Sequence, residues 1–302
     1  MKKINYHTHT YRCGHANGSE EDMVKAAIEI GIEELGMCCH VPFPHYRQHL
    51  IKSIPAIRSL RSLLSLGLAF VKNGPHMRMP YTDLEEHLEK VSECKNKYKE
   101  QITIYQGFEA EGLTEYFNYY QSLLYEHKVD YLILGHHFHK HCIHSDYFGR
   151  DNMTKKDIYL YCNDVEKAIE THLFSYIAHP DLFLMGYQQF DLDAQTVSRR
   201  ICEKAKEHHI PLEINAGGIR KGLRNINGEE LYLYPNAHFW DIASEIGNDV
   251  IIGFDAHDPS DFNNAMYKQL LKFAEDHQLH LIDHFKFLQG DFSQFQGAYD
   301  IR

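Results

Sequence analysis

Short apolar runs alternate along this chain with longer stretches in which apolar side chains recur at helical spacing. Seven runs have the length and apolar character of buried strands: Ile4–Tyr6, Leu35–Cys39, Ile102–Phe108, Tyr131–Leu134, Ser175–Ala178, Pro211–Ile214 and Val250–Phe254. Six stretches have the periodicity of helices: Glu20–Ile30, Asp83–Lys97, Lys156–His172, Ala194–His208, Asn236–Glu245 and Ser260–Asp276. This alternation predicts a parallel β-sheet with helices packed outside it, either open or closed into a barrel.

Two of the predicted helices begin with capping-box spacing, in which Thr82 precedes Glu85 and Thr154 precedes Asp157. One segment, residues 45–80, interrupts the alternation of strands and helices. We interpret it as an insertion, helical around Ile54–Phe70, that either partly covers the functional site or forms an extra surface helix. Because no clear boundary separates a second domain, we expect residues 1–302 to form a single domain.

A polar side chain that can bind a metal ion or a substrate follows every predicted strand. In strand order these side chains are His7, His9 and His15; His40; Glu109; His136 and His137; His179 and Asp181; Asn215; and Asp255 and His257. Each has an ordinary structural explanation, such as a helix cap, a turn or a buried histidine. Seven strand ends would need seven such explanations, whereas the carboxyl ends of parallel strands gather at one face. We therefore predict that these side chains converge on one metal site.

The types of side chain limit which metals fit. Imidazole and carboxylate groups without a cysteine thiolate suit Zn, Fe or Mn and are unlike a structural zinc site built from cysteines. The number of candidates exceeds what one ion needs, so we predict two or three divalent ions. Adjacent ions that share a carboxylate can activate a bridging water and hold phosphate oxygens, which predicts phosphoester hydrolysis.

The composition and net charge of the chain limit the kinds of partner that it can bind. The chain has 302 residues, of which 43% are hydrophobic and 24% charged, and a formal net charge of −11. That charge argues against a nucleic-acid or anionic-membrane partner but admits a small anionic substrate whose charge is met by metal ions. The seven cysteines form no Cys-x-x-Cys pair, and the sequence shows neither a secretory signal nor a membrane span. We therefore expect a reduced, cytoplasmic protein.

Seven motifs spread over residues 4 to 259 carry a family resemblance: "HTHTYRCGH", "CCHVPF", "GFEAE", "DYLILGHHF", "AHPDLF", "EINAGGIR" and "IIGFDAHDP". With these motifs the chain resembles the polymerase and histidinol phosphatase (PHP) superfamily of metallohydrolases, and within it the monofunctional histidinol-phosphate phosphatases. The resemblance implies a distorted (β/α)7 TIM-like barrel with a trinuclear metal centre at the carboxyl ends of its strands. It also implies three ligand sets, one for each ion: His7, His9, Glu109 and Asp255; Glu109, His137 and His179; and His15, His40 and His257.

The chain departs from the family pattern at three points. The motif "GHHFH" offers His136 as a competitor to His137, and Glu111 competes with Glu109. Cys39 occupies a position where the family commonly has an acidic or polar residue, which puts in doubt a contact behind the ligands rather than the ligand His40 itself.

By the same resemblance, the substrate is L-histidinol phosphate, the products are L-histidinol and phosphate, and the pathway is histidine biosynthesis. We assign catalytic roles to Glu109, Asp255, His257, Arg150 and Arg220, and substrate-binding roles to Arg150, Arg220 and His45. Guanidinium groups match phosphate oxygens, although either arginine could equally form a structural salt bridge. His45 or His139 could donate a proton to the leaving alkoxide.

Three alternatives remain open at this point. The site could cleave phosphodiesters, as nuclease members of the superfamily do, although the acidic chain lacks a basic aromatic stripe. It could hydrolyse a different small phosphomonoester. The chain could also be a non-catalytic metal-binding module, against which the nearly complete ligand set argues.

Overall fold

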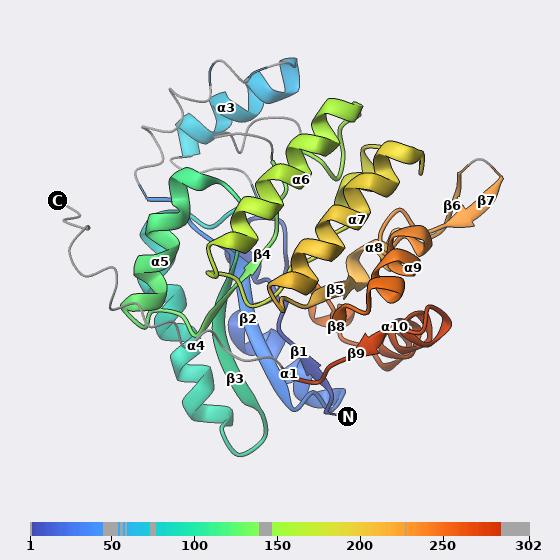
Figure 1. Ribbon diagram of the computed structural model, residues 1–302. Helices are drawn as coiled ribbons and strands as arrows, with labels where there is room; N and C mark the ends of the chain where they lie inside the picture. Colours follow the sequence, from blue (N-terminus) through green and yellow to red (C-terminus); the bar gives the residue numbers. More distant parts are fainter. Residues whose placement is uncertain are drawn as a thin grey trace.

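Parallel strands form the centre of the protein, and helices pack around them, as the ribbon of this computed structural model shows (Figure 1). The structure describes residues 2–44, 54, 57, 59–72, 77–138, 147–226 and 228–284. Four strands pair in parallel in the order β1-β2-β3-β4: β1 (Ile4–Asn5), β2 (Glu34–His40), β3 (Thr103–Ala110) and β4 (Tyr131–Leu134). Three more pair in parallel in the order β5-β8-β9: β5 (Leu212–Asn215), β8 (Asp249–Gly253) and β9 (His280–Leu281).

Single bridges connect these two groups of strands. Ile177 pairs in parallel with Leu134 of β4 on one side and with Leu212 of β5 on the other. Thr8, just after β1, pairs with Ala256, just after β8. The parallel sheet is therefore curled, and the carboxyl ends of its strands lie around one opening. The predicted strand at 175–178 is reduced to these isolated contacts, and a count of seven strand–helix units stays a prediction.

All six predicted helices are present, within a few residues of the predicted bounds. The structure describes these helices: α1 (Glu20–Glu29), α3 (Leu60–Lys72), α4 (Leu84–Tyr98), α5 (Phe117–Tyr125), α6 (Lys155–Glu170), α7 (Leu192–Glu207), α8 (Ala216–Arg220), α9 (Ala237–Ile246) and α10 (Asn264–Asp276). Short 3-10 turns lie at Tyr11–Cys13, Tyr81–Asp83, Thr114–Tyr116, Leu182–Met185 and Pro259–Asp261. A hairpin of β6 (Arg224–Ile226) and β7 (Glu229–Leu231) projects from the sheet (Figure 1).

One of the two predicted capping boxes is confirmed. Thr154 accepts a hydrogen bond from the backbone N–H of Asp157, whose carboxylate accepts from Thr154 in return. The prediction at Thr82 is wrong. The chain after Pro80 first forms a 3-10 turn, so that α4 begins only at Leu84 and Thr82 donates to its neighbour Asp83 instead.

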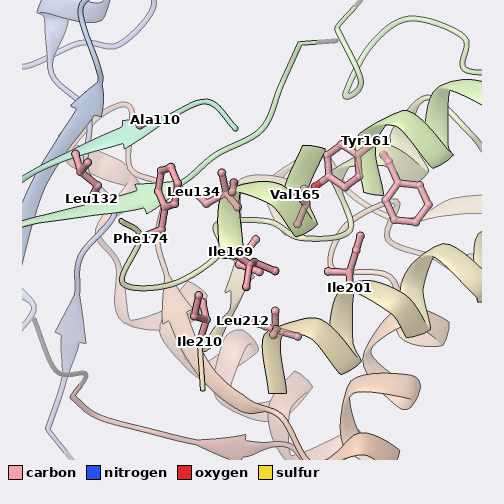
Figure 2. Close-up of a cluster of buried hydrophobic side chains, with 14 of the residues drawn as sticks. Ala110, Leu132, Leu134, Tyr161, Val165, Ile169, Phe174, Ile201, Ile210 and Leu212 are labelled. Atoms are coloured by element: carbon pink, nitrogen blue, oxygen red, sulfur yellow. The ribbon is translucent and has the colours of Figure 1, made fainter. Parts of the chain in front are cut away.

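The largest apolar core lies between the curled sheet and α6 and α7 (Figure 2). Leu134 and Leu212 point into it from the strands, and Ile169 and Ile201 meet them from the helices; all four side chains are fully buried. Cutting one of these side chains to alanine would cost about 2–5 kcal/mol of folding free energy. Packing of this kind fixes the strand ends and therefore the side chains that follow them.

The predicted insertion contributes α3, which lies near α5 and α6 at the carboxyl-end side of the sheet (Figure 1). Leu60, Leu63, Leu64 and Leu68 on this helix are each more than half exposed. Where the insertion returns to the sheet, Met77 lines the cavity described below. Whether residues 45–80 cover the site, and whether 1–302 form one domain, stay predictions. No helix in the described ranges is long and apolar enough to span a bilayer.

Candidate metal centre

All nine predicted metal ligands come together at the carboxyl ends of the strands. His7 and His9 follow β1, His40 ends β2, Glu109 lies near the end of β3, and Asp255 and His257 follow β8. Most of the nine line a cavity of about 360 Å³, together with Tyr147, Arg220, Lys221 and Tyr234. The two ligands absent from its lining, His7 and His9, are fully buried behind it.

Glu109 is the centre of the cluster. Its Oε1 lies 2.9 Å from His179 Nε2 and 3.2 Å from His137 Nε2. Its Oε2 lies 2.8 Å from His40 Nδ1 and 3.4 Å from His7 Nε2. Burial alone would raise the pKa of this carboxyl, but the surrounding imidazoles hold it well below its usual value, so Glu109 is an anion.

Asp255 forms a second anionic centre beside the first. Its Oδ1 lies 3.3 Å from His9 Nε2, 3.5 Å from His7 Nε2 and 3.3 Å from His257 Nδ1. Burial would raise the pKa of this carboxyl too, but His7 and His257 keep it well below the usual range. The backbone of Asp255 has φ 47°, in the left-handed region that residues other than glycine rarely adopt. Such strain concentrates at functional sites, where surrounding contacts hold it in place.

The orientation of two histidines tests whether a cation fits between them. His15 Nδ1 donates to the carbonyl of Cys13, and His257 Nδ1 donates to the carbonyl of Asp255. Because a carbonyl can only accept, both Nε2 atoms must carry lone pairs in the neutral rings, and they face each other at 2.9 Å. Burial lowers the pKa of His15 to about 4, which leaves its imidazole neutral at neutral pH. A cation between the two nitrogens would remove this repulsion.

The remaining distances also fit metal ligation. Ligand nitrogens of a tetrahedral zinc site, with bonds of about 2.0–2.1 Å, lie about 3.3 Å apart, close to the separations found here. His40 Nδ1 and Glu109 Oε2 are buried and only 2.8 Å apart, yet neither has a hydrogen-bond partner within the described part of the chain. Burial lowers the pKa of both His9 and His40 well below normal, which leaves neutral imidazoles suited to a metal.

Four groups of three side chains place one ligand atom each within 4.8 Å of one another: His7, His9 and Asp255; His7, Glu109 and His179; His40, Glu109 and His137; and His9, His40 and His257. The groups overlap, so the donors form one continuous cluster. The division into three ligand sets, one for each ion, stays a prediction.

Two buried glutamates hold predicted ligands in place, and sequence reasoning missed this role for both. Glu213 of β5 accepts from His7 Nδ1 at 2.9 Å and from the backbone N–H of His179 at 3.1 Å. Glu111 accepts from both the backbone N–H and Nδ1 of His137. The signal for Glu213 was a charged residue inside the apolar run "PLEIN", where a strand side chain has no solvent to face.

The structure distinguishes His137 from its competitor His136 by the direction in which each side chain points. His136 accepts from the backbone N–H of Gly112 and packs against Phe148 and Tyr161, away from the cluster, whereas His137 faces Glu109. Three other polar residues at strand ends serve the scaffold. Asn215 caps α8, Asp181 accepts from the start of α9, and Cys39 accepts from the backbone N–H of Thr10.

The predicted substrate residues differ in their placement. Arg220 lines the cavity, but it donates to the carbonyls of Phe254 and Asp255 and pairs with Asp261. Arg150 forms a salt bridge with Asp151 and is absent from the described lining of the cavity. His45 and His139 lie outside the described residues. Lys221, which sequence reasoning missed, lines the cavity 5.5 Å from the centre of the Tyr234 ring.

The geometry of this cluster can now be compared with known proteins. A family model described as the PHP domain matches residues 5–217. The chain belongs to the PHP domain family.

Relatives of this PHP protein extend over most of its length. A probable histidinol-phosphatase of Deinococcus radiodurans is 23% identical over 262 residues, covering 84% of this chain and 86% of the relative. The crystal structure of a putative histidinol phosphatase from Listeria monocytogenes has 22% identity and a TM-score of 0.66, covering 88% of this chain and 99% of that one. The histidinol phosphate phosphatase of Lactococcus lactis, solved with zinc, L-histidinol and phosphate, has 14% identity and a TM-score of 0.60, covering 94% and 97%. The resemblance carried by the seven motifs is confirmed, and these structures share the fold.

Gly135 leaves the space that the Glu109 carboxylate occupies. A Cβ at this position would lie 2.0 Å from Glu109 Oε1 and 2.5 Å from its Cδ. We expect Gly135→Ala to displace Glu109, to destabilise the fold by about 1–3 kcal/mol as overpacking does, and to weaken metal binding strongly. Denaturant unfolding and zinc titration measure the two effects. Gly67→Ala, where a Cβ meets nothing within 4 Å, is the matched control. Wild-type zinc binding by Gly135→Ala would contradict the central place of Glu109.

Asp255 offers a direct test of ligation. Asp255→Asn keeps the size of the side chain but removes the charge that faces three imidazoles. We expect the folded variant to lose at least one equivalent of bound metal, measured by elemental analysis after zinc loading. Asp258→Asn, which alters the cap of the 3-10 turn at Pro259–Asp261 and a hydrogen bond from Asn17, should keep the wild-type content. Equal metal content in both variants would remove Asp255 from the ligands.

Proposed function

We propose that this PHP protein is a metal-dependent phosphomonoesterase that hydrolyses L-histidinol phosphate to L-histidinol and phosphate, in histidine biosynthesis. The observation that carries the proposal is the ring of imidazoles around two anionic carboxylates, with facing lone pairs on His15 and His257. The names of the relatives, and the L-histidinol and phosphate bound in the Lactococcus lactis structure, support the choice of substrate.

The proposed ligands of two or three Zn, Fe or Mn ions are His7, His9, His15, His40, Glu109, His137, His179, Asp255 and His257. When bound, such ions polarise phosphate oxygens and lower the pKa of water towards neutrality. Glu109, which lies between the donor groups, would serve as a ligand common to two ions. Glu213 and Glu111 accept from the Nδ1 atoms of His7 and His137, which leaves the Nε2 lone pairs directed at the centre.

Side chains in the walls of the cavity would bind the parts of the substrate that the metal ions do not contact. Arg220 donates to the backbone carbonyl of Asp255 and also lines the cavity. Lys221 makes no ion pair with any described residue, and burial lowers its pKa, so a ligand anion is its natural partner. Tyr147, stacked on His137 with ring centres 5.5 Å apart, and Tyr234 form flat apolar walls suited to the imidazole end of the substrate.

The decisive experiment is phosphate release from L-histidinol phosphate by metal-loaded protein. We expect turnover of this substrate to exceed that of phosphoserine and p-nitrophenyl phosphate, to be lost on chelation and to return on adding Zn or Mn. Similar rates on all monoesters would indicate a phosphatase that acts on a different substrate. Cleavage of DNA or RNA oligonucleotides would favour the phosphodiesterase alternative, and metal binding without any turnover would favour a non-catalytic module.

Lys221 tests how the phosphate is bound. Hydrogen bonds to charged groups contribute about 1.5–3 kcal/mol, so Lys221→Met should raise KM for L-histidinol phosphate about 10- to 100-fold. Steady-state kinetics and inhibition by inorganic phosphate measure the effect. Lys272→Met, on the exposed side of α10, is the control, because its ammonium pairs only with Asp276 among the described residues. An unchanged KM and an unchanged inhibition constant would show that Lys221 does not contact the phosphate.

A further inference from the structure

Arg78 is an arginine buried near the end of the 45–80 insertion, just before the 3-10 turn that leads into α4. Its side chain is only 2% exposed, and its guanidinium lies 4.9 Å from the centre of the Phe43 ring and 5.8 Å from that of Phe138. The carboxylate it contacts is that of Glu111, which is itself fully buried. Burying such a charge is unfavourable unless it is paired, so this ion pair needs a reason beyond packing.

Glu111 in turn contacts His137, one of the predicted metal ligands. Its Oε2 accepts from the backbone N–H of His137 at 2.6 Å, and its Oε1 accepts from His137 Nδ1 at 2.9 Å. With the Nδ1 proton directed at Glu111, the lone pair of His137 lies on Nε2, which faces Glu109 at 3.2 Å. One carboxylate therefore sets both the backbone position and the tautomer of this ligand.

The chain gives Glu111 little other support. Among the described residues, its side-chain ion-pair partners are Arg78, His137, and His136, whose Nδ1 lies 3.7 Å from Glu111 Oε2. Removing Arg78 would leave the buried Glu111 carboxylate without its guanidinium partner, and a buried charge that loses its partner is unfavourable. A Glu111 carboxylate displaced in this way would no longer hold both N–H groups of His137.

We propose that Arg78 and Glu111 are positioning residues that fix His137 as a metal ligand, so that the 45–80 insertion contributes to metal affinity through Arg78. The proposal rests on the metal centre of the proposed function. It assigns no contact with substrate to either residue.

The test measures metal affinity rather than turnover. Zinc binding to the full-length protein is followed by competition with a chromophoric chelator, and stoichiometry by elemental analysis. We expect Glu111→Gln and Arg78→Met to bind at least one equivalent of zinc about 10- to 100-fold more weakly, the usual effect of losing a group that orients a ligand. Arg78→Lys, which keeps the charge, should recover part of the affinity.

A matched control separates lost positioning from a lost ion pair. Arg200 pairs with Glu166 between α6 and α7, with no described contact to a ligand, so Arg200→Met should keep wild-type zinc affinity. In a His137→Ala background, Arg78→Lys should weaken zinc binding no further, because the path through His137 is already gone. That double variant keeps the proposal testable even if Arg78→Met fails to fold.

The outcomes distinguish this inference from the proposed function. Wild-type zinc affinity and stoichiometry in Glu111→Gln and Arg78→Lys would overturn the positioning role, whatever the enzyme hydrolyses. Additive losses from Arg78→Lys and His137→Ala would also overturn it, since Arg78 would then act by another route. Zinc binding that depends on Arg78 in a protein that releases no phosphate from any monoester would overturn only the proposed function.

Discussion

The structure depends on keeping two carboxylates, Glu109 and Asp255, ionised inside a shell of imidazoles. A buried carboxylate normally takes up a proton, because the charged form is poorly solvated away from water. Here the imidazoles lower both pKa values. The same crowding places lone pairs against each other, most clearly at His15 and His257. The anionic carboxylates and the facing lone pairs of the imidazoles both favour a bound cation.

Holding that arrangement costs backbone freedom, which explains several features of the scaffold. His179 and Asp255 both have positive φ angles, and each is braced through its main chain. Glu213 accepts from the N–H of His179, and Arg220 donates to the carbonyl of Asp255. Gly253 leaves room for the Glu213 carboxylate, because a Cβ at this position would lie 1.8 Å from Glu213 Oε1. Strain at the ligands is therefore maintained by buried polar contacts from neighbouring strands, as expected where a surrounding fold over-determines a conformation.

Reasoning from the sequence succeeded where the order of residues along the chain determines where they lie in the fold. Apolar runs identified the strands, and in a parallel sheet the residue after each strand must face the same end, so His40 and Asp255 could be placed together. It failed where the outcome depends on contacts between distant segments. The choice of Glu109 over Glu111 rested on the family resemblance, and nothing local reveals that Glu213 turns towards His7. The capping box at Thr82 was wrong because a 3-10 turn over Tyr81–Asp83 follows Pro80, so that α4 begins only at Leu84.

The distribution of charge would let a chain with a net charge of −11 accept the proposed anionic substrate. The long-range field of such a protein repels anions, so attraction must be local and short-ranged. Five histidines line the cavity with Glu109 and Asp255, and Arg220 and Lys221 line it too. Metal ions bound to the histidines would reverse the sign of the site without changing that of the surface. An enzyme arranged in this way would favour small phosphates over nucleic acids, because a long polyanion must also approach the acidic surface while a monoester needs only the cavity.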